Sequence, residues 1–569
     1  MPWANIFLDK LKHNMILYVL IMASLRKKII KGRPYYYVVV SKRINGKPKI
    51  VHQTYLGTAE AVVKKLTTIP DPLEVEHTSF GEVAALWAEV EELDMIRLID
   101  EVIPQHPNRE VSIGTFLTVG AINRALDPRS KDGVGRWMKK TVLGDLLKQP
   151  AEGFDSQSFW DAMDLVEDHH IEAIEEKLWE KILTLYQILT DVLLWDTTNF
   201  ATHMDGLTSS ELAQRGKPKK GAPDQRLIGL GMAATPVIGL PFLHKVYAGN
   251  QHDAKLFPEA LSLLVHRYKH LAKASDGLTL IIDKGNNSKE NIQFGNRQGV
   301  SFIGSLKPSH FPQFLKIPLK DYTESIRPYL IHRRRAKIFG KERTLVITFH
   351  QKLYERQKKT LQARLDKVSL ELEARFQEEQ SKETYRHKPQ ILLKQYEAYL
   401  KKKGLHCLLR VKIRGKKEPR LIISKALRPL RNREKPFGKT ILFSDRDDLS
   451  SQQIIDAYHG KNVLEEDFKF LKDRHYLHFE PVYHWTDQKI KVHALMCVLG
   501  LILVKLLLYR ISQANLSMSL PVLMEELKDM KKIILVYPQG QVKQKLSKLS
   551  SIQQQLFRLF NLSKYIDSS

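Results

Sequence analysis

LTDVLLWDTTNF, residues 189–200, is the stretch that decides how this sequence is expected to fold. It is an apolar run that ends on Asp196 and then turns polar, as a buried strand does where it leaves a sheet. A second stretch of the same kind, TLIIDKGN at 279–286, ends its apolar run on Asp283. Aspartates at the ends of neighbouring strands are well placed to converge, although such residues are also common in turns and helix caps.

Strands and helices alternate around these two stretches. Helices are expected at 255–271 and from Ser288, and further strand-like runs are RLIGLGMAAT (226–235), FLHKVYAG (242–249) and VSFIGSLK (300–307). Three strands, a helix, a strand, a helix and a strand is the order of an RNase H-like α/β core, a mixed sheet with flanking helices. The pattern therefore predicts the first part of such a catalytic core over 188–308.

The core pattern stops after Pro308 and resumes with TILFSD (440–445), which a long helix follows from near Leu449. We predict a large basic α+β insertion domain at 309–439 and the second part of the core at 440–512. The insertion carries an amphipathic or coiled-coil seam with apolar residues four, three and four apart, namely Leu361, Leu365, Val368 and Leu372. Strand-like runs flank that helix, namely RTLVITFH (343–350), LLRVKIRG (408–415) and RLIISKAL (420–427).

Two further segments precede the core and one follows it. Tyr35–Val40 and Ile50–Tyr55 flank Asn45-Gly46, a dipeptide that suits a tight turn, so 1–79 is expected to be a basic segment with a β-hairpin. Residues 80–187 show apolar positions three and four apart and predict a helical DNA-binding domain. A C-terminal helical tail is expected at 513–569. The true start of translation is expected at Met22 rather than Met1.

Six cations in the helical block gather near Trp137, and these are Arg124, Arg129, Lys131, Arg136, Lys139 and Lys140. One interpretation is that they present positive charge to DNA beside an aromatic ring. The other is an exposed basic helix end next to a tryptophan of the core.

Positive charge is concentrated in two segments. The chain has a net charge of +27; residues 331–440 hold 32 Lys and Arg against 11 Asp and Glu, and residues 1–60 hold 11 against 2. Charge confined in this way indicates a surface for a polyanion, and nucleic acid is the expected one. We expect Arg333, Arg334 and Arg335 and the basic cluster at 401–420 to contact phosphates.

Composition also limits the setting of the protein. Cys407 and Cys497 are the only cysteines, too few for a disulfide framework or a cysteine-based zinc site, so a reducing cytoplasm is expected. The apolar stretch at 492–509 is long enough to suggest a membrane span, but it contains His493 and Lys505. A buried core helix is the preferred interpretation.

A third candidate carboxylate lies on the helix after 449. Tyr458, Lys461, Glu465 and Lys472 follow one another at offsets of 3, 7 and 14 from the tyrosine, which places them on one stripe of a continuous helix. An adjacent stripe of Leu464, Phe468 and Leu471 is expected to attach the helix to the core. Ordinary surface salt bridges have similar spacing, so this pattern alone leaves both interpretations open.

The spacing from Tyr458 to Lys472 resembles the Tyr-(2)-Arg-(3)-Glu-(6)-Lys signature of a group of bacterial insertion-sequence DDE transposases. Lysine replaces the usual arginine at 461, which keeps the charge but loses bidentate phosphate geometry. The aspartates in WDTTNF and IIDKGN match the pattern of that group, and the segment at 32–57 resembles the start of one of its subgroups. The resemblance covers roughly residues 24–510.

This resemblance implies a DNA transposase with two Mg²⁺ or Mn²⁺ ions bridged by Asp196, Asp283 and Glu465. It also implies that Tyr458, Lys461 and Lys472 hold the DNA backbone of the transposon end, and that target DNA and a second copy of the chain join the complex as a homodimer. Two alternatives remain: an RNase H-like nuclease without strand transfer, and a catalytically inactive DNA-binding relative.

Overall fold

The computed structural model describes residues 23–44, 47–67, 72–104, 109–204, 208–216, 225–272, 277–381, 389–415, 419–479, 484–538 and 541–566. The chain divides into two compact units. Unit 1 comprises 1–77 and 532–547, and unit 2 comprises 78–531 and 548–569. The hairpin turn expected at Asn45-Gly46 lies outside the described residues.

Unit 1 contains two small antiparallel sheets. The first has the order β1-β2-β3 and is followed by helix α2; the bounds are β1 Ala23–Ile30, β2 Arg33–Ile44, β3 Lys47–Gly57 and α2 Ala59–Thr67. The two predicted strands are confirmed, and a third strand, β1, lies where only a basic lead-in was expected. The second sheet has the order β18-β17-β4, from β4 Glu74–Ser79, β17 Lys531–Val536 and β18 Val542–Leu546. The C-terminal segment therefore contains strands as well as the expected helices, α19 Leu520–Lys528 and α20 Ser551–Leu559.

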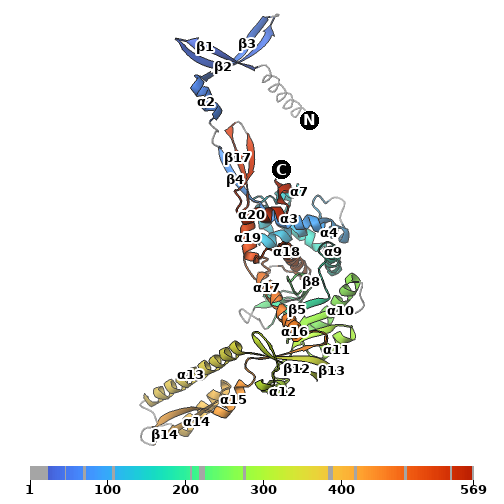
Figure 1. Ribbon diagram of the computed structural model, residues 1–569, viewed down its shortest axis with the longest axis vertical. Helices are drawn as coiled ribbons and strands as arrows, with labels where there is room; N and C mark the ends of the chain where they lie inside the picture. The colour runs from blue at the N-terminus through green and yellow to red at the C-terminus, as the bar shows by residue number, and fades with distance from the viewer. Residues whose placement is uncertain are drawn as a thin grey trace. The chain divides into compact units, whose positions relative to one another are not determined.

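A mixed sheet of ten strands forms the centre of unit 2 (Figure 1). Its order is β11-β12-β13-β16-β10-β9-β5-β7-β6, and β8 also pairs with β7. β5 runs parallel to β9 and β9 parallel to β10, whereas β7 and β8 are antiparallel to their neighbours. The strands are β5 Val192–Ala201, β6 Gln214–Arg215, β7 Arg226–Ala234, β8 Pro241–Ala248, β9 Thr279–Ile282, β10 Ser301–Ser305, β11 Glu324–Ile326, β12 Tyr329–Ile338, β13 Lys341–His350 and β16 Lys439–Ser444.

The strand and helix order predicted for 188–308 is present in the structure. Helices α10 Asp253–Ala272 and α11 Lys289–Arg297 connect β8, β9 and β10 in the expected places. The side chain of Ser288 accepts a hydrogen bond from the backbone of Asn291 and caps α11, which explains why that helix begins there.

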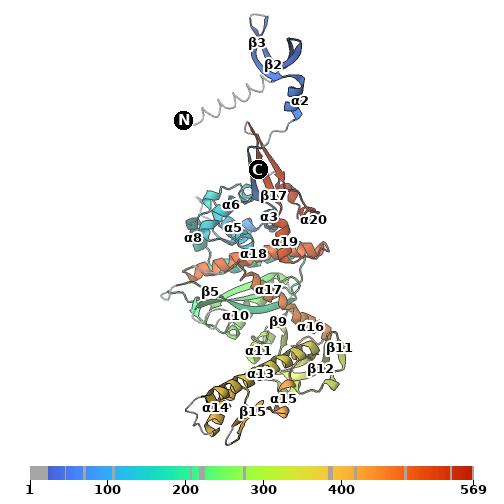
Figure 2. The same ribbon diagram turned by 90° about the vertical axis from the view of Figure 1, so that its left-hand side faces the viewer.

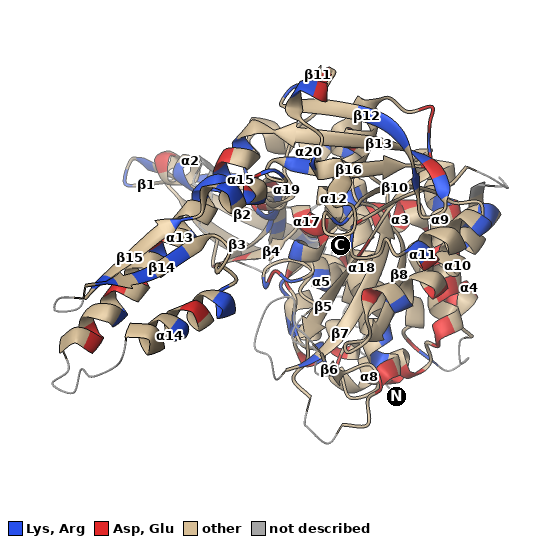
Figure 3. Ribbon diagram, turned by 90° about the horizontal axis from the view of Figure 1, so that it is seen from below, with Lys and Arg blue, Asp and Glu red and all other residues tan. Residues whose placement is uncertain are grey.

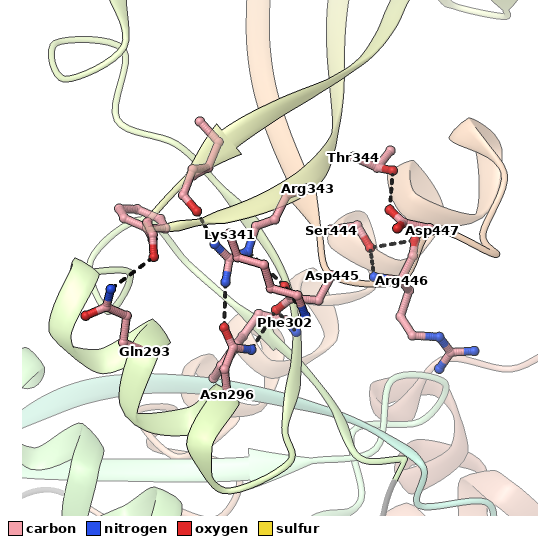
Figure 4. A network of polar contacts seen from close by, with 12 residues as sticks. Gln293, Asn296, Phe302, Lys341, Arg343, Thr344, Ser444, Asp445, Arg446 and Asp447 are labelled. Atoms are coloured by element: carbon pink, nitrogen blue, oxygen red, sulfur yellow. Dashed lines mark hydrogen bonds and ion pairs between the residues drawn. The ribbon is translucent and has the colours of Figure 1, made fainter.

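The sheet continues beyond Pro308 into the segment that was assigned to the insertion. β13 pairs with β16 along six residues of each strand, so the strands just before and just after residues 351–434 share one sheet. A fully buried pair reinforces this junction: Arg343 donates from Nε to Asp445 Oδ1 over 2.8 Å, and Nη2 donates to Asn296 Oδ1 over 2.6 Å (Figure 4). We call these residues the Arg343 network.

Short helices surround one long apolar helix, α18 Asp487–Gln513. It packs against α5, α3 and β8, and Figure 2 shows it between α5 and the strand β5. By length and composition α18 is the one helix among the described residues that is apolar enough to cross a membrane, but 89% of its apolar window is buried inside the protein. The expected buried core helix is confirmed. The surrounding helices are α3 Gly81–Leu93, α4 Met95–Val102, α5 Ile113–Leu126, α6 Lys131–Met138, α7 Leu143–Leu147, α8 Ser156–Asp164 and α9 Asp168–Tyr186.

The cations near Trp137 do not form one surface. Arg124 and Lys131 are buried: Arg124 Nη1 donates to the carbonyl of His478 over 3.2 Å, and Lys131 Nζ lies 3.5 Å from Met496 Sδ. Burial lowers the pKa of Lys131 to about 7. Of the exposed ones, three pair with acids, Arg129 with Asp127, Arg136 with Asp132 and Lys139 with Glu152. Because charged groups buried in this way cannot reach phosphates, the idea that all six face DNA is wrong.

A lobe with its own hydrophobic core extends from the end of β13 (Figures 1 and 2). It consists of α13 Gln351–Ser381, α14 Pro389–Lys402, the hairpin of β14 Leu409–Arg414 and β15 Arg420–Lys425, and α15 Leu427–Glu434. Leu365, Val368 and Leu372 of the predicted seam are buried and pack against Leu392, Tyr396 and Leu400 of α14. The seam residues therefore belong to the hydrophobic core of this lobe. We refer to residues 351–434 as the lobe.

Candidate active site

The register of two parallel strands places Asp196 and Asp283 side by side. Trp195 of β5 is the partner of Ile282 of β9, and each aspartate is the residue that follows. Neighbouring strands lie about 4.8 Å apart, so the two backbones approach closely at this point. Asp283 follows the end of β9 as expected. Asp196 does not end its strand, because β5 continues to Ala201 through its pairing with β7.

The side chain of Asp196 shares a face of β5 with Thr198 and Phe200, since alternate residues of a strand point the same way. Lys472 Nζ donates to Thr198 Oγ1 over 2.7 Å and lies 5.1 Å from the centre of the Phe200 ring. Phe200 also stacks on Phe479 at 4.2 Å between ring centres. The segment around Lys472 therefore covers the face of the sheet on which Asp196 lies.

Asp283 contacts two of the predicted site residues. Lys461 Nζ donates to Asp283 Oδ1 over 2.9 Å, and the Tyr458 hydroxyl donates to the same oxygen over 3.1 Å. Burial opposes ionisation of Asp283, but the hydrogen bond and the charge of Lys461 outweigh it and lower the pKa of this carboxyl group. Burial raises the pKa of the Tyr458 hydroxyl. Both groups therefore stay in the form in which tyrosine donates and aspartate accepts.

Glu465 lies on the other side of the same lysine. Its Oε1 is 3.8 Å from Lys461 Nζ, and its side chain is 50% exposed. Within the described part of the chain, no group of three or more His, Cys, Asp or Glu residues has the arrangement of a metal site. The ammonium group of Lys461 thus lies within 4 Å of the carboxylates of both Asp283 and Glu465.

The predicted continuous helix is interrupted at Lys461. α16 Ser451–Gly460 ends one residue before it, and α17 Asn462–Phe470 begins one residue after it. Gly460, the last residue of α16, favours this break because glycine has the lowest helix propensity after proline. Lys472 lies beyond the end of α17, so the single helical stripe of four residues is wrong, although tertiary packing still brings all four to the sheet face of the aspartates.

Leu464, Phe468 and Leu471 are buried, as predicted. Asp467, which was not predicted, lies fully buried on the same stripe and forms an ion pair with the buried Lys505 of α18. The spacing of Asp467 from Leu464 and Leu471, three and four residues, was the signal that could have revealed it. This pair fixes α17 to the core helix and so sets the position of Glu465.

The three consecutive arginines of β12 have partners within the protein. Arg333 Nη2 donates to the carbonyl of Leu449 over 2.9 Å, and Arg335 forms an ion pair with Asp447. Arg334 points to the other face of the strand and lies 5.7 Å from the centre of the Phe314 ring. Two of the three arginines therefore hold the loop that leads into α16, a role that sequence analysis did not assign to them.

A cavity of about 230 Å³ adjoins the site and was not predicted. Tyr329, His350, Arg356, Tyr458 and His459 are among its lining residues. Tyr329 stacks on His459 at 5.7 Å between ring centres, and the Tyr329 hydroxyl is 3.0 Å from His459 Nε2. The cavity is therefore lined by residues of β12, of β13 and of the helix that carries Tyr458.

Comparison with known proteins identifies a family to which this chain is related. The family model described as Transposase DDE domain matches residues 190–503, which is more than half of the chain. The chain therefore belongs to the transposase DDE domain family. No curated protein matches it significantly.

A search of solved structures finds a piggyBac transposase synaptic complex with hairpin DNA. The match has 10% sequence identity and a TM-score of 0.33, and it covers 82% of this chain and 81% of that chain.

Proposed function

We propose that this protein is a DNA transposase of a bacterial insertion sequence that cuts and joins strands through Asp196, Asp283 and Glu465 on an RNase H-like core. One observation carries the proposal: Asp196 and Asp283 follow a register pair of two parallel strands, under the segment that contains Glu465. Family membership supports the same chemistry on phosphodiester bonds. The lobe, residues 351–434, lies in the sequence between β13 and β16 of this core.

The residues present suit divalent cations. The donor set of three carboxylates consists of hard oxygen ligands, which Mg²⁺ and Mn²⁺ prefer. The Lys461 ammonium between Asp283 and Glu465 indicates that this location already stabilises positive charge. Two bound ions would activate an attacking oxygen and stabilise a leaving oxygen. Binding of such ions requires Lys461 to move from Asp283 toward solvent or phosphate.

The remaining site residues hold the DNA. Tyr458, Lys461 and Lys472 provide a hydroxyl donor and two ammonium groups on the side of the sheet where the aspartates lie. They orient the scissile phosphate of the transposon end against the carboxylates for attack by water, which frees a 3′-hydroxyl. They then hold that 3′-hydroxyl for attack on a phosphodiester of target DNA, where the new bond forms as the target strand is broken and its 3′-oxygen leaves. Arg333, Arg334 and Arg335 of β12 are proposed to contact further phosphates, Arg334 from the opposite face of the strand. Two copies of the chain act as a homodimer on the two inverted repeats, in the cytoplasm next to the nucleoid.

The experiment is cleavage of a plasmid that carries the gene with its native flanking DNA. We expect cuts at the element ends with Mg²⁺ or Mn²⁺ and none in EDTA, followed by joining of the freed 3′ ends to a second plasmid. Undiminished cutting in EDTA would refute the metal mechanism. Cutting without joining would favour the RNase H-like nuclease, and binding without cutting would favour the inactive relative.

A further inference from the structure

The exposed face of the β14–β15 hairpin carries a row of cations at every second residue. Arg410, Lys412 and Arg414 are exposed, whereas Leu409 and Val411, which alternate with them, are buried in the lobe core. Alternate residues of a strand are about 6.6 Å apart, so these three cations form a line along one face. We call Arg410, Lys412 and Arg414 the cation row.

The fold gains nothing from this row of charge. Across the hairpin Arg414 is the direct partner of Arg420, and like charges in that position destabilise a strand pair. Within the described residues, none of the three cations of the row forms an ion pair. Lys425, on the opposite face of the same hairpin, does form one, with Asp366 of α13 over 3.0 Å. The hairpin therefore neutralises Lys425 on its inner face, whereas the cation row on its outer face has no acidic partner among the described residues.

A groove between α14 and β14 extends the row. It has a volume of about 580 Å³ and is lined by Lys394, Lys401, His406, Arg410 and Lys412, with Glu397 as its one acidic residue. Figure 3 shows Lys and Arg recurring along this lobe. A groove with several cations and a line of evenly spaced charges fits the backbone of duplex DNA, where phosphates repeat regularly.

The lobe places this surface far from the carboxylates. α13 starts directly after His350, which lines the cavity beside Tyr458, and Gln380 near its other end donates to the carbonyl of Pro419 over 2.7 Å. Thirty residues of helix at 1.5 Å each span about 45 Å. The tip of the hairpin, with Arg414 and Arg420, therefore lies about 13 base pairs of duplex away, at about 3.4 Å per base pair.

We infer that the lobe binds the sugar–phosphate backbone of duplex DNA away from the bond that is cut, with the hairpin tip more than one helical turn from that bond. This inference rests on the proposed function and names a second contact of the same complex. The duplex can be the transposon end or the flanking and target DNA, since both present the same phosphates. The lobe then contacts phosphates of the DNA duplex at a distance from the cut bond and contributes affinity that is independent of base sequence.

Cys407 provides a direct test, because it is exposed and adjacent to His406 of the groove, whereas Cys497 is buried. A benzophenone maleimide is attached to Cys407 of the full-length protein. The labelled protein is irradiated with duplexes of about 40 base pairs, long enough for the reach of the lobe at 3.4 Å per base pair. One duplex has arbitrary sequence, and two others carry the element end with either a long inner or a long outer arm.

Lys403, four residues before Cys407, accepts a hydrogen bond through its carbonyl from Arg364, the 14th residue of α13. We therefore expect cross-links to duplex DNA that are displaced by about six base pairs or more from the cut site on the end-containing duplexes. The arm that is cross-linked identifies the transposon or the flanking side. Replacing the cation row together, Arg410→Gln, Lys412→Gln and Arg414→Gln, should abolish most cross-linking and lower the slope of log affinity against log salt by about 2 to 3. The matched control Lys425→Gln should leave both unchanged.

Failure of this inference is distinct from failure of the proposed function. If the labelled protein cuts the plasmid but gives no cross-link, or if the triple replacement leaves the salt dependence unchanged, the lobe does not bind DNA. Circular dichroism of the triple variant, compared with Lys425→Gln, establishes that the lobe is folded. If the wild-type protein neither binds nor cuts DNA, the proposed function fails and this inference fails with it.

Discussion

At the scale of single residues, Lys461 forms an ion pair with Asp283 and approaches Glu465, the residue proposed as the third metal ligand. Glu465 is 3.8 Å from that ammonium, whereas Glu466 is an exposed residue one step further around α17. One residue corresponds to about 100° of helix rotation, so the two glutamates face different directions.

We therefore expect Glu465→Gln to reduce metal-dependent cleavage by at least about 100-fold, since changes around metal ligands alone cost 10–100-fold. Glu466→Gln is the matched control and should retain most of the activity. The measurement is the initial rate of plasmid nicking at saturating Mg²⁺. The reverse result would show that the orientation of α17 assigned here is incorrect, and with it the roles of Tyr458, Lys461 and Lys472.

Glu82 is a buried acid that makes stability depend on pH. Its Oε2 has no hydrogen-bond partner, and burial raises its pKa to about 7, against the opposing charge of Lys531. Between the pKa of the unfolded chain, about 4.5, and about 7, the folded state binds more protons than the unfolded state. Stability from this group is therefore complete below pH 4.5 and declines as the pH rises through 7.

Replacing Glu82 with Gln removes this pH dependence. At pH 8 we expect Glu82→Gln to raise the free energy of unfolding by up to about 3 kcal/mol, at 1.36 kcal/mol per unit of pKa shift. At pH 5 the variant and the wild type should have similar stability. Urea unfolding at the two pH values measures the difference, and a gain that is equal at both would exclude ionisation of Glu82 as its cause.

At the scale of elements, the Arg343 network joins segments that come before and after the lobe in the sequence. Arg343 and Asp445 are fully buried, so the loss of one partner leaves an uncompensated charge in the core. We expect Arg343→Met to lower the free energy of unfolding by about 3–5 kcal/mol. Arg335→Ala breaks an exposed ion pair with Asp447 and should cost about 1 kcal/mol or less. Chemical denaturation of both variants provides the comparison, and equal losses would contradict a special role for the buried pair.

The arginines of β12 have two possible uses, and one measurement separates them. Arg333 and Arg335 contact the loop before α16, so DNA binding has to exchange these partners for phosphates. Neutralising Arg333, Arg334 and Arg335 together should lower the slope of log affinity against log salt by close to one for each phosphate that the arginines neutralise. An unchanged slope with reduced stability would assign the three arginines to the loop alone.

At the scale of the whole molecule, two basic segments expected to bind DNA lie apart in the chain from the aspartates proposed for cleavage. The cation row belongs to the lobe, and 23–57 in unit 1 contains 9 Lys and Arg without an acidic residue, whereas Asp196 and Asp283 lie on the central sheet. Distant sites act independently to within about 0.5 kcal/mol.

Asp196→Asn and Asp283→Asn should therefore abolish cleavage and leave the dissociation constant for duplex DNA within about twofold. Fluorescence anisotropy with a labelled duplex gives the binding constant, and plasmid nicking gives the activity. A parallel loss of binding and cleavage would indicate that the aspartates support folding instead, because each lies at the junction of β5, β7 and β9.

The sequence by itself determined the local features that depend on periodicity and on chemical type. Continuous apolar runs that end in polar residues predicted β5, β7, β8, β9 and β10, the segments between them predicted α10 and α11, and apolar residues three and four apart predicted the seam of the lobe. It also identified Asp283 at the end of a strand and the stripe of Leu464, Phe468 and Leu471, because residues buried on one face of a helix recur at a regular spacing.

Only the tertiary structure decided the relations between distant segments. Parallel register, set by hydrogen bonds between β5 and β9, makes Asp196 the neighbour of Asp283, and pairing with β16 draws β13 into the main sheet. The break at Lys461, the burial of Arg124 and Lys131 and the Asp467–Lys505 pair depend on packing against segments far away in the chain. No local pattern records such contacts, since the energy that fixes them comes from surfaces that meet only when the chain has folded.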